Sequence, residues 1–314
     1  MKYRKRNSEE PTYWVGFEEH GEEPLRGSSN NSPFIWGQIF HGLMKIENQI
    51  PFFVVEKLYN LLVPPDDDHI SIIELAHSYL KEYLELVVCC GKNFNLENQK
   101  VQHLFDLLYQ IQVTGDWTLN HKETPSDKRW SCKWIQCATK LRDCGIRFHQ
   151  KKGTSILDVK FQKGVMEIPS INMFDGVVPI LKNLIAYEQC YSPIQYFTTY
   201  ASFMDFFIDT PKDVKVLCDA NIIELSFSNK DEVSTVFNNL QRGTLSNTKT
   251  SNYLARVMYE VNRYSESGQH RWREILVTNY CDTSWSTIRL GTAIVLVLCT
   301  LLQTFYTVYT HYHK

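Results

Sequence analysis

Two acidic side chains, Glu188 and Glu47, have the chemistry of a general acid or base, because a carboxyl group can exchange a proton with a substrate. Glu188 precedes Gln189 and falls within a predicted apolar helix, so we expect it to be buried. A catalytic acid needs a partner that tunes its pKa, and Arg142 or Arg147 could pair with it. Buried acids more often form structural ion pairs or helix caps. We therefore favour a structural role for Glu188, with catalysis as the alternative.

Glu47 belongs to a polar group with Asn48 and Gln49, just before Pro51. Proline has no backbone N–H, so Pro51 interrupts the helical pattern of apolar residues on either side. We predict that the three polar side chains satisfy backbone groups at this break, capping one helix and starting the next. A catalytic Glu47 is the weaker interpretation, because no His or Cys stands at a fixed spacing from it.

Metal chemistry would require the cluster of Cys132, Cys137, Cys144 and His149. Structural zinc sites use closely spaced Cys-x₂₋₄-Cys pairs, and this spacing does not supply two of them. We expect these thiols to pack in the core and predict no metal. The chain also lacks a Gly-rich phosphate loop, a Gly-x-Ser-x-Gly elbow and a His-Glu-x-x-His motif, so it predicts no cofactor and no recognisable catalytic centre.

The composition narrows the class of protein. The 314 residues carry a net charge of −2, so no global basic field indicates nucleic acid as a partner. The nine cysteines are an odd number without a regular framework, which favours reduced thiols over a secreted disulfide scaffold. The first residues contain no apolar signal segment, which counts against an extracellular receptor. The 17 Tyr, 17 Phe and 7 Trp residues predict an aromatic-rich core.

Most of the chain has helical periodicity. Helical patterns follow Phe34, Phe52, Ile73 and Val101, and another begins near Ser126. We predict a mainly α-helical α+β domain over residues 34–284, with a β-hairpin at about residues 155–168, where Leu157, Val159 and Phe161 alternate with polar residues. A polar, disordered arm of residues 1–33 precedes it. Local signals mark helix ends: Gly145 and Asn221 suit left-handed caps, and Thr210, Pro211 and Asp213 suit a capping box.

Residues 285–314 carry the predicted anchor. The 21 residues that begin at Leu290 and end at Thr310, with Val297 and Leu301 inside, contain no charge. As a helix they would be about 32 Å long, enough to cross a hydrocarbon core of about 30 Å. Before this span lie Arg271, Arg273 and Arg289; after it lies Lys314 alone. The bias predicts a single-pass protein whose main domain is cytosolic, at the plasma membrane or an endomembrane.

Four stretches carry a family resemblance: IENQIPFFVVEKL at residues 46–58, residues 138–169, NLIAYEQC at residues 183–190, and residues 204–223 with Phe-Asn-Asn-Leu at 237–240. In this order they resemble the plant family called domain of unknown function 247, or uncharacterised protein family 0481, over about residues 38–310. The family-motif residues are Glu47, Asn48, Gln49, Pro51, Glu188 and Gln189.

The resemblance implies a plant membrane-associated protein with a mostly helical domain and no established biochemical activity. Some grass members are linked to self-incompatibility between pollen and stigma. The chain lacks the VSIGPYHHG-like motif with which members usually begin, so it is similar to a shortened or divergent member. It also has Asn221 where glycine is frequent.

Two hypotheses for function follow. The first is a membrane-tethered interaction or signalling module that contacts the bilayer and an unidentified protein, because the chain has an anchor but no catalytic motif. The second is an unrecognised enzyme that uses a buried acid such as Glu188 or Glu47. A broad apolar surface would favour the first, and a cleft with convergent acids of perturbed pKa would favour the second.

Overall fold

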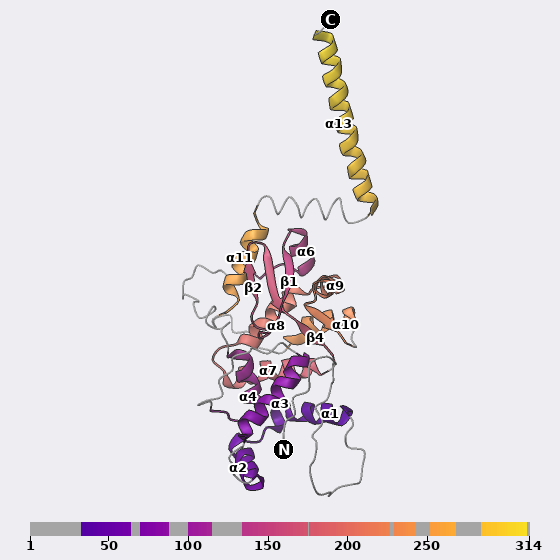
Figure 1. Ribbon diagram of the computed structural model, residues 1–314. Coiled ribbons are helices and arrows are strands. Elements are labelled where there is room, and N and C mark those ends of the chain that lie inside the picture. The colour runs from indigo at the N-terminus through magenta and orange to yellow at the C-terminus, as the bar shows by residue number, and fades with distance from the viewer. Residues whose placement is uncertain are drawn as a thin grey trace. The chain divides into compact units, whose positions relative to one another are not determined.

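The computed structural model describes residues 33–63, 70–87, 100–114, 134–174, 176–226, 229–242, 252–267 and 284–312 (Figure 1). Side chains are described except at 33–37, 82–87, 284–290 and 310–312. The chain divides into two compact units, Met1–His41 and Gly42–Lys314. Helix α1 (Pro33–Leu43) lies mostly in the first, and the remaining elements lie in the second. The predicted arm falls, apart from Pro33, outside the described residues.

Pro51 separates two helical stretches, as the sequence predicted. The short 3₁₀ helix η1 ends before it at Asn48, and α2 begins directly after it at Phe52. Pro51 forms an isolated antiparallel bridge with His103, and the Phe52 N–H donates to the Gln102 carbonyl at 2.7 Å. These contacts join the start of α2 to the start of α4. The helices of this region are η1 (Ile46–Asn48), α2 (Phe52–Leu62), α3 (Ile72–Val87) and α4 (Leu104–Val113).

The predicted hairpin is confirmed, with a later start. Strands β2 (Lys160–Gln162) and β3 (Val165–Pro169) pair antiparallel across Lys163 and Gly164, whose φ angles are 49° and 79°. Two positive φ angles suit the type I′ turn of a two-residue hairpin. A Cβ on Gly164 would lie 2.4 Å from the Tyr264 hydroxyl, so packing also requires glycine there. Residues 155–159, predicted as strand, instead form a turn and irregular backbone.

Two parallel strand pairs were not predicted. Strand β1 (Arg147–Lys151) pairs parallel with β3 and gives a three-stranded sheet of order β1-β3-β2. Strand β4 (Ile171–Met173) pairs parallel with β5 (Ile223–Leu225) in a separate two-stranded sheet. The domain is therefore mainly helical, with a small mixed sheet where the sequence predicted a hairpin alone.

The later helices follow local signals closely. Gly145 and Asn221 adopt φ angles of 95° and 55°, which confirms both left-handed caps. Of the helix predicted to begin near Ser126, residues 126–133 lie outside the described ranges, residues 134–137 are not helical, and α6 begins at Ala138. The helices are α6 (Ala138–Asp143), α7 (Val177–Tyr191), α8 (Tyr196–Phe207), α9 (Pro211–Asp219), α10 (Lys230–Leu240) and α11 (Ala255–Ser265).

Helix α8 runs through an aromatic core, as the composition predicted. It packs against α7 and α10, and α9 contacts α10, α6 and β5. The side chains of Tyr200, Phe203 and Phe207 are at most 1% exposed, and Phe207 meets Phe148 of β1 edge-on at 5.5 Å. Each buried aromatic side chain removes a large apolar area from water, so this cluster supplies much of the hydrophobic stabilisation.

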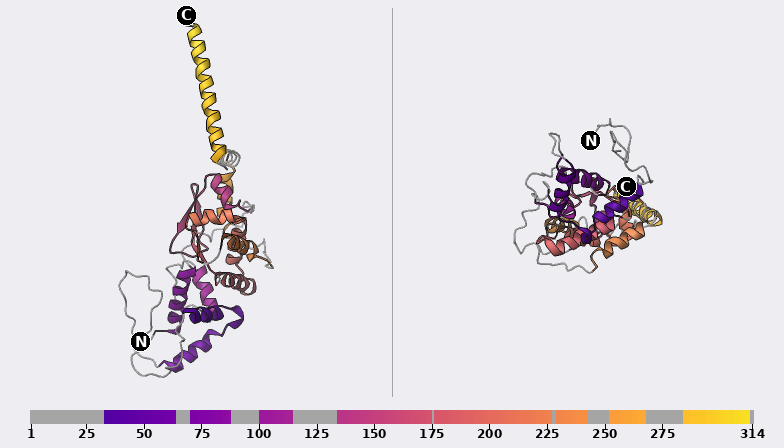
Figure 2. Two further views of the ribbon diagram at one scale, coloured as in Figure 1. Left: turned by 90° about the vertical axis from the view of Figure 1, so that its right-hand side faces the viewer. Right: turned by 90° about the horizontal axis from the view of Figure 1, so that it is seen from below.

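Helix α13 (Ser284–Tyr312) is continuous in both views (Figure 2). Its segment Gly291–Tyr309 has a mean hydropathy of 1.7, and none of it is buried against the rest of the described chain. Val297 and Leu301 are 57% and 62% exposed. By length and composition this helix could cross a membrane.

Candidate functional site

Glu188 forms a cap that joins two helices. Its side chain lies in the last turn of α7 and accepts hydrogen bonds at the first turn of α8. Oε1 accepts the Phe197 N–H at 2.8 Å, and Oε2 accepts the Thr198 N–H at 2.9 Å and the Thr198 hydroxyl at 3.0 Å. These amides have no partner within their own helix, so Glu188 satisfies groups that would otherwise be buried without one. The contacts of Glu188 are therefore those of a helix cap rather than those of an ion pair with Arg142 or Arg147.

Gln189 supports the same cap. Its side-chain amide lies 3.4 Å from the Thr198 hydroxyl oxygen, which accepts from it while donating to Glu188. Neighbouring residues of the family motif therefore act on one helix start. The α7 backbone directs both side chains toward α8, so the pair works as a unit.

Tyr109 of α4 completes the surroundings of Glu188. Its hydroxyl is 3.2 Å from Glu188 Oε1 and 3.2 Å from Ser192 Oγ. Ser192 Oγ donates to the Ile194 carbonyl at 2.7 Å, so it can accept from Tyr109. When Glu188 is ionised, the Tyr109 hydroxyl donates a hydrogen bond to it. When Glu188 is protonated, its carboxyl hydrogen can be donated to the Tyr109 oxygen, and the Tyr109 hydroxyl then donates to Ser192. The network therefore accommodates both protonation states of Glu188.

Burial raises the pKa of Glu188 to about 7, although hydrogen bonds from Phe197, Thr198 and Tyr109 oppose that rise. The pKa of Tyr109 is raised by burial and by the nearby Glu188 carboxylate. A carboxyl group with a pKa near neutrality has the proton affinity of a general acid or base. Glu188 is nevertheless 0% exposed, so a substrate could reach it only if α7 and α8 moved apart.

A second buried acid, Asp106, lies one aromatic ring away. Tyr187 donates to Asp106 Oδ1 at 2.8 Å, and Gln110 and the Gln102 N–H donate to Oδ2 at 3.0 and 2.8 Å. The rings of Tyr187 and Tyr109 are 5.0 Å apart, so the two acid networks pack against each other. Here too the acid holds a helix start, because Gln102 stands just before α4. The sequence analysis did not predict a role for Asp106. The pattern that could have indicated one is an acidic residue in the first turn of a helix.

The polar group around Pro51 caps the end of α1 as predicted, but the helix start that it caps is that of α4, because α2 has no side-chain cap at Pro51. Gln49 Oε1 accepts the Phe105 N–H at 2.9 Å, and its Nε2 donates to the carbonyls of Leu43 and Lys45 at 2.7 Å each. Asn48 Nδ2 donates to the Gly42 carbonyl at 3.2 Å. Gln49 thus joins the end of one helix to the start of α4, far along the chain.

Glu47 is exposed on η1, and the described contacts do not bring it to Glu188. The two acids of the enzyme hypothesis therefore form no common centre in the part of the chain that the structure describes. Each of them has to be judged alone as a candidate acid or base.

Asp213 caps two helices at once. Its Oδ2 accepts the N–H and hydroxyl of Thr210 at 2.9 and 2.8 Å, which confirms the predicted capping box of α9. Its Oδ1 accepts the N–H and hydroxyl of Thr139, in the first turn of α6, at 2.8 and 2.6 Å. Burial alone would raise the pKa of Asp213, but these four donors lower it overall. Asp213 therefore stays ionised while it joins α6 to α9.

Asp213→Asn should lower the free energy of unfolding by about 2 kcal/mol at neutral pH, because an amide can accept at only one of the two helix starts. The lowered pKa means that the ionised form stabilises the fold above the unfolded pKa, and this gain is lost as pH falls through the folded pKa. The variant and native chain should therefore converge in acid. Urea unfolding of both in detergent tests this, with exposed Asp219→Asn of the same helix as control. A loss unchanged by acid would contradict the role of the ionised carboxylate.

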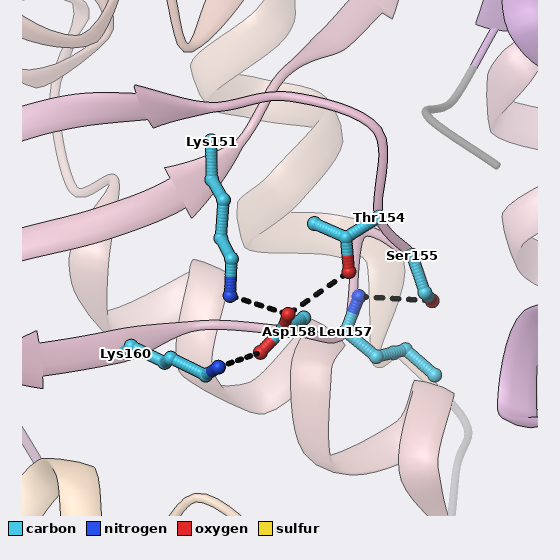
Figure 3. Close-up of polar contacts among 6 residues, drawn as sticks. All are labelled: Lys151, Thr154, Ser155, Leu157, Asp158 and Lys160. Atoms are coloured by element: carbon cyan, nitrogen blue, oxygen red, sulfur yellow. Dashed lines mark hydrogen bonds and ion pairs between the residues drawn. The ribbon is translucent and has the colours of Figure 1, made fainter. Parts of the chain in front are cut away.

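A third buried acid, Asp158, was predicted to face outward in a strand but is 4% exposed. It forms an ion pair with Lys151 of β1, Lys160 Nζ lies 3.7 Å from its Oδ1, and Thr154 donates to Oδ2 at 2.9 Å (Figure 3). Beside it the Leu157 N–H donates to Ser155 Oγ at 3.3 Å. The pKa of Lys151 is lowered by burial, although Asp158 opposes the change. Since its partners lie within seven residues, Asp158 chiefly fixes the turn between β1 and β2.

The structure describes three members of the predicted cluster of three cysteines and one histidine. Cys144 is buried, Cys137 is half-buried just before α6, and both are free thiols; Cys132 lies outside the described residues. His149 is exposed on β1. Across the described ranges, no group of three or more His, Cys, Asp or Glu side chains is placed to hold a metal ion. The described thiols therefore contribute to packing at the α6 end of the domain.

Helix α2 carries four large apolar side chains that are more than half exposed among the residues that the structure describes. Phe52 is its one buried residue. Phe53, Leu58, Leu61 and Leu62 are 59%, 55%, 81% and 81% exposed, and we call these four side chains the α2 surface. Lys57 adds a positive charge at its edge, with its ammonium 5.9 Å from the Phe53 ring centre. Several large apolar side chains of one helix that are open to water are typical of an interaction site.

Comparison with known proteins gives one family and two relatives. A family described as plant protein of unknown function, DUF247, matches residues 3–299. UPF0481 protein At3g47200 of Arabidopsis thaliana is 28% identical over 304 residues, which cover 86% of this chain and 60% of the relative. Putative UPF0481 protein At3g02645 of the same plant is 26% identical over 185 residues, 57% of this chain and 34% of the relative. The chain thus spans less than two thirds of either relative. No solved structure matches it significantly.

Proposed function

The chain belongs to the DUF247 family of plant proteins of unknown function, and from its own surfaces we propose that it is a membrane-tethered protein-interaction module. The observation that carries this proposal is the α2 surface, where four large apolar side chains remain more than half exposed. Burying them against a partner would remove apolar area from water at about 25 cal/mol per Å². The partner would be a protein with a complementary apolar groove or helix.

The tether in this proposal is α13. Its exposed apolar segment Gly291–Tyr309 would span the bilayer once. Arg271, Arg273 and Arg289 before the span, against Lys314 after it, favour a cytosolic main domain at the plasma membrane or an endomembrane. Tethering would hold the α2 surface close to the membrane and raise its effective concentration for partners there.

Leu58→Ser with Leu61→Ser should remove partner binding without unfolding the domain, because both side chains are more than half exposed. Proximity labelling in plant cells, with the full chain fused to a labelling enzyme, measures this as loss of the enriched proteins. Asn60→Ser, an exposed polar change on the same helix, is the matched control and should keep them. The same labelled proteins for the double variant and the native chain would contradict a role for the α2 surface.

An enzyme that uses Glu188 is the second candidate, and one observation favours it: the raised pKa of about 7. Its four hydrogen bonds and its complete burial favour a structural role instead. Catalysis would require an opening between α7 and α8 that admits a substrate. The structural role needs no such movement, so we place the interaction module first.

A further inference from the structure

A glutamine lies deep in the proposed membrane span. The middle residue of Gly291–Tyr309 is Thr300, and Gln303 is three residues further on, about 4.5 Å along the helix axis. With a hydrocarbon core of about 30 Å, its backbone would stand about 10 Å from the nearer interface. A primary amide at that depth costs free energy unless its donors and acceptor find partners. Across the described residues, the Gln303 side chain makes no hydrogen bond.

The polar side chains of the span share one face of α13. At about 100° per residue, the threonines and the glutamine fall within an arc of about 120°. The opposite side carries large apolar side chains suited to lipid, among them Leu298, Leu301 and Phe305. We call the first set the polar face; it consists of Thr292, Thr300, Gln303, Thr304 and Thr307. A purely lipid-exposed helix has no reason to collect its polar residues on one side.

The threonines on the polar face are already satisfied. Thr300 donates to the carbonyls of Leu296 and Val297 at 3.0 and 2.8 Å, Thr304 to Thr300 at 2.7 Å, and Thr307 to Gln303 at 2.8 Å. Their side chains are short, so a neighbouring helix could approach this face closely. The unmet hydrogen-bonding capacity therefore concentrates on Gln303.

We propose that α13 associates through its polar face with α13 of a second copy of this chain, and that the two Gln303 amides pair with each other. An amide both donates and accepts, so a two-fold arrangement satisfies both glutamines reciprocally with identical surfaces. A shallow open hollow lined by Leu302, Gln303, Tyr306 and Thr307 lies beside this face. It runs between two i, i+4 ridges, the kind of groove into which a ridge of a second helix packs. This inference rests on the proposed membrane tether.

Gln303→Leu should weaken association of the full chain by about 3- to 30-fold, the range expected from intramembrane polar contacts. Energy transfer between donor- and acceptor-labelled copies in phosphatidylcholine vesicles measures it as a function of protein-to-lipid ratio. Gln303→Asn keeps the amide and should retain most of the association. Phe305→Leu, on the opposite side of α13, is the matched control and should associate like the native chain.

Two outcomes would overturn the proposal: no energy transfer between native copies, or equal energy transfer between Gln303→Leu copies and between native copies. Resistance to carbonate extraction is measured for every variant in the same vesicles. If the native chain is extracted, the tether and the dimer fail together. If it resists extraction but its copies do not associate, only the dimer fails.

Discussion

Glu188→Gln should become more stable relative to the native chain as pH rises from about 5 to about 8, by about 2.5 kcal/mol. The pKa of Glu188 is raised from 4.5 to about 7 in the folded chain. A raised folded pKa means that the stabilising contribution is complete below the unfolded pKa and is lost as pH rises through the folded value. At about 1.4 kcal/mol per unit, the full shift of about 2.5 units is worth about 3.5 kcal/mol, and about 2.5 kcal/mol of it falls between pH 5 and pH 8 because the unfolded pKa lies below 5. Glutamine cannot ionise, so the variant avoids the loss.

Urea unfolding followed by tryptophan fluorescence, with the full chain in detergent, would measure this difference at several pH values. Trp134 is a suitable reporter, because its ring stacks on Phe206 of α8 at 4.8 Å. The matched control is Glu224→Gln on β5, an exposed acid whose replacement should leave the pH profile unchanged. A constant difference between Glu188→Gln and the native chain would show that the four donors keep Glu188 ionised throughout.

Glu188→Ala separates the cap from its titration. It leaves the backbone N–H groups of Phe197 and Thr198 without their acceptor in a buried place, which should cost about 3 kcal/mol even at pH 5, whereas the Tyr109 hydroxyl can still donate to Ser192. Glutamine keeps one acceptor oxygen there and should lose less. Alanine and glutamine variants of equal stability at pH 5 would contradict the role of Glu188 as a helix cap.

Features set by a few adjacent residues were predicted correctly. The capping box of Thr210 and Asp213, the left-handed caps at Gly145 and Asn221, and the turn at Gly164 all depend on local backbone preferences that single residue types reveal. The break at Pro51 belongs to the same class, because proline removes a donor wherever it stands. Local chemistry thus places these particular helix ends and turns.

Features that join distant segments could not be predicted in the same way. Strand β4 is three residues long and pairs with β5, with Ile171 opposite Ile223; such short strands carry no readable alternation. Likewise, sequence indicated that Glu188 caps a helix or forms an ion pair, but its partners at Phe197 and Thr198 follow from the angle between α7 and α8. The predicted alternation placed Asp158 on the outer face of a strand, which is wrong because residues 155–159 form a turn and irregular backbone and Asp158 is buried.

The candidate sites also combine local features, which the sequence shows, with contacts between distant segments, which it does not. The caps formed by Gln49 and Asp213 each join a local signal to a distant helix: Phe105 for Gln49 and Thr139 for Asp213. Their polar residues are visible in sequence, and their second partner is visible only in the fold. Glu188 has the same character: in the sequence it is a candidate catalytic acid, and in the structure it joins α7 to α8.

Val297→Arg should release the protein from membranes while the domain stays folded. Val297 lies three residues before the middle of Gly291–Tyr309, where an arginine costs about 2.5–3.5 kcal/mol on insertion scales, or about 100-fold in the insertion equilibrium. The side chain is 57% exposed and α13 is not buried against the described domain, so the change removes no core contact. Carbonate extraction measures release, and circular dichroism checks the fold. Val297→Leu is the control and should remain in the pellet. An arginine variant that also stays in the carbonate-resistant pellet would mean that α13 alone does not anchor the chain, and the α2 surface would then have to act without this tether.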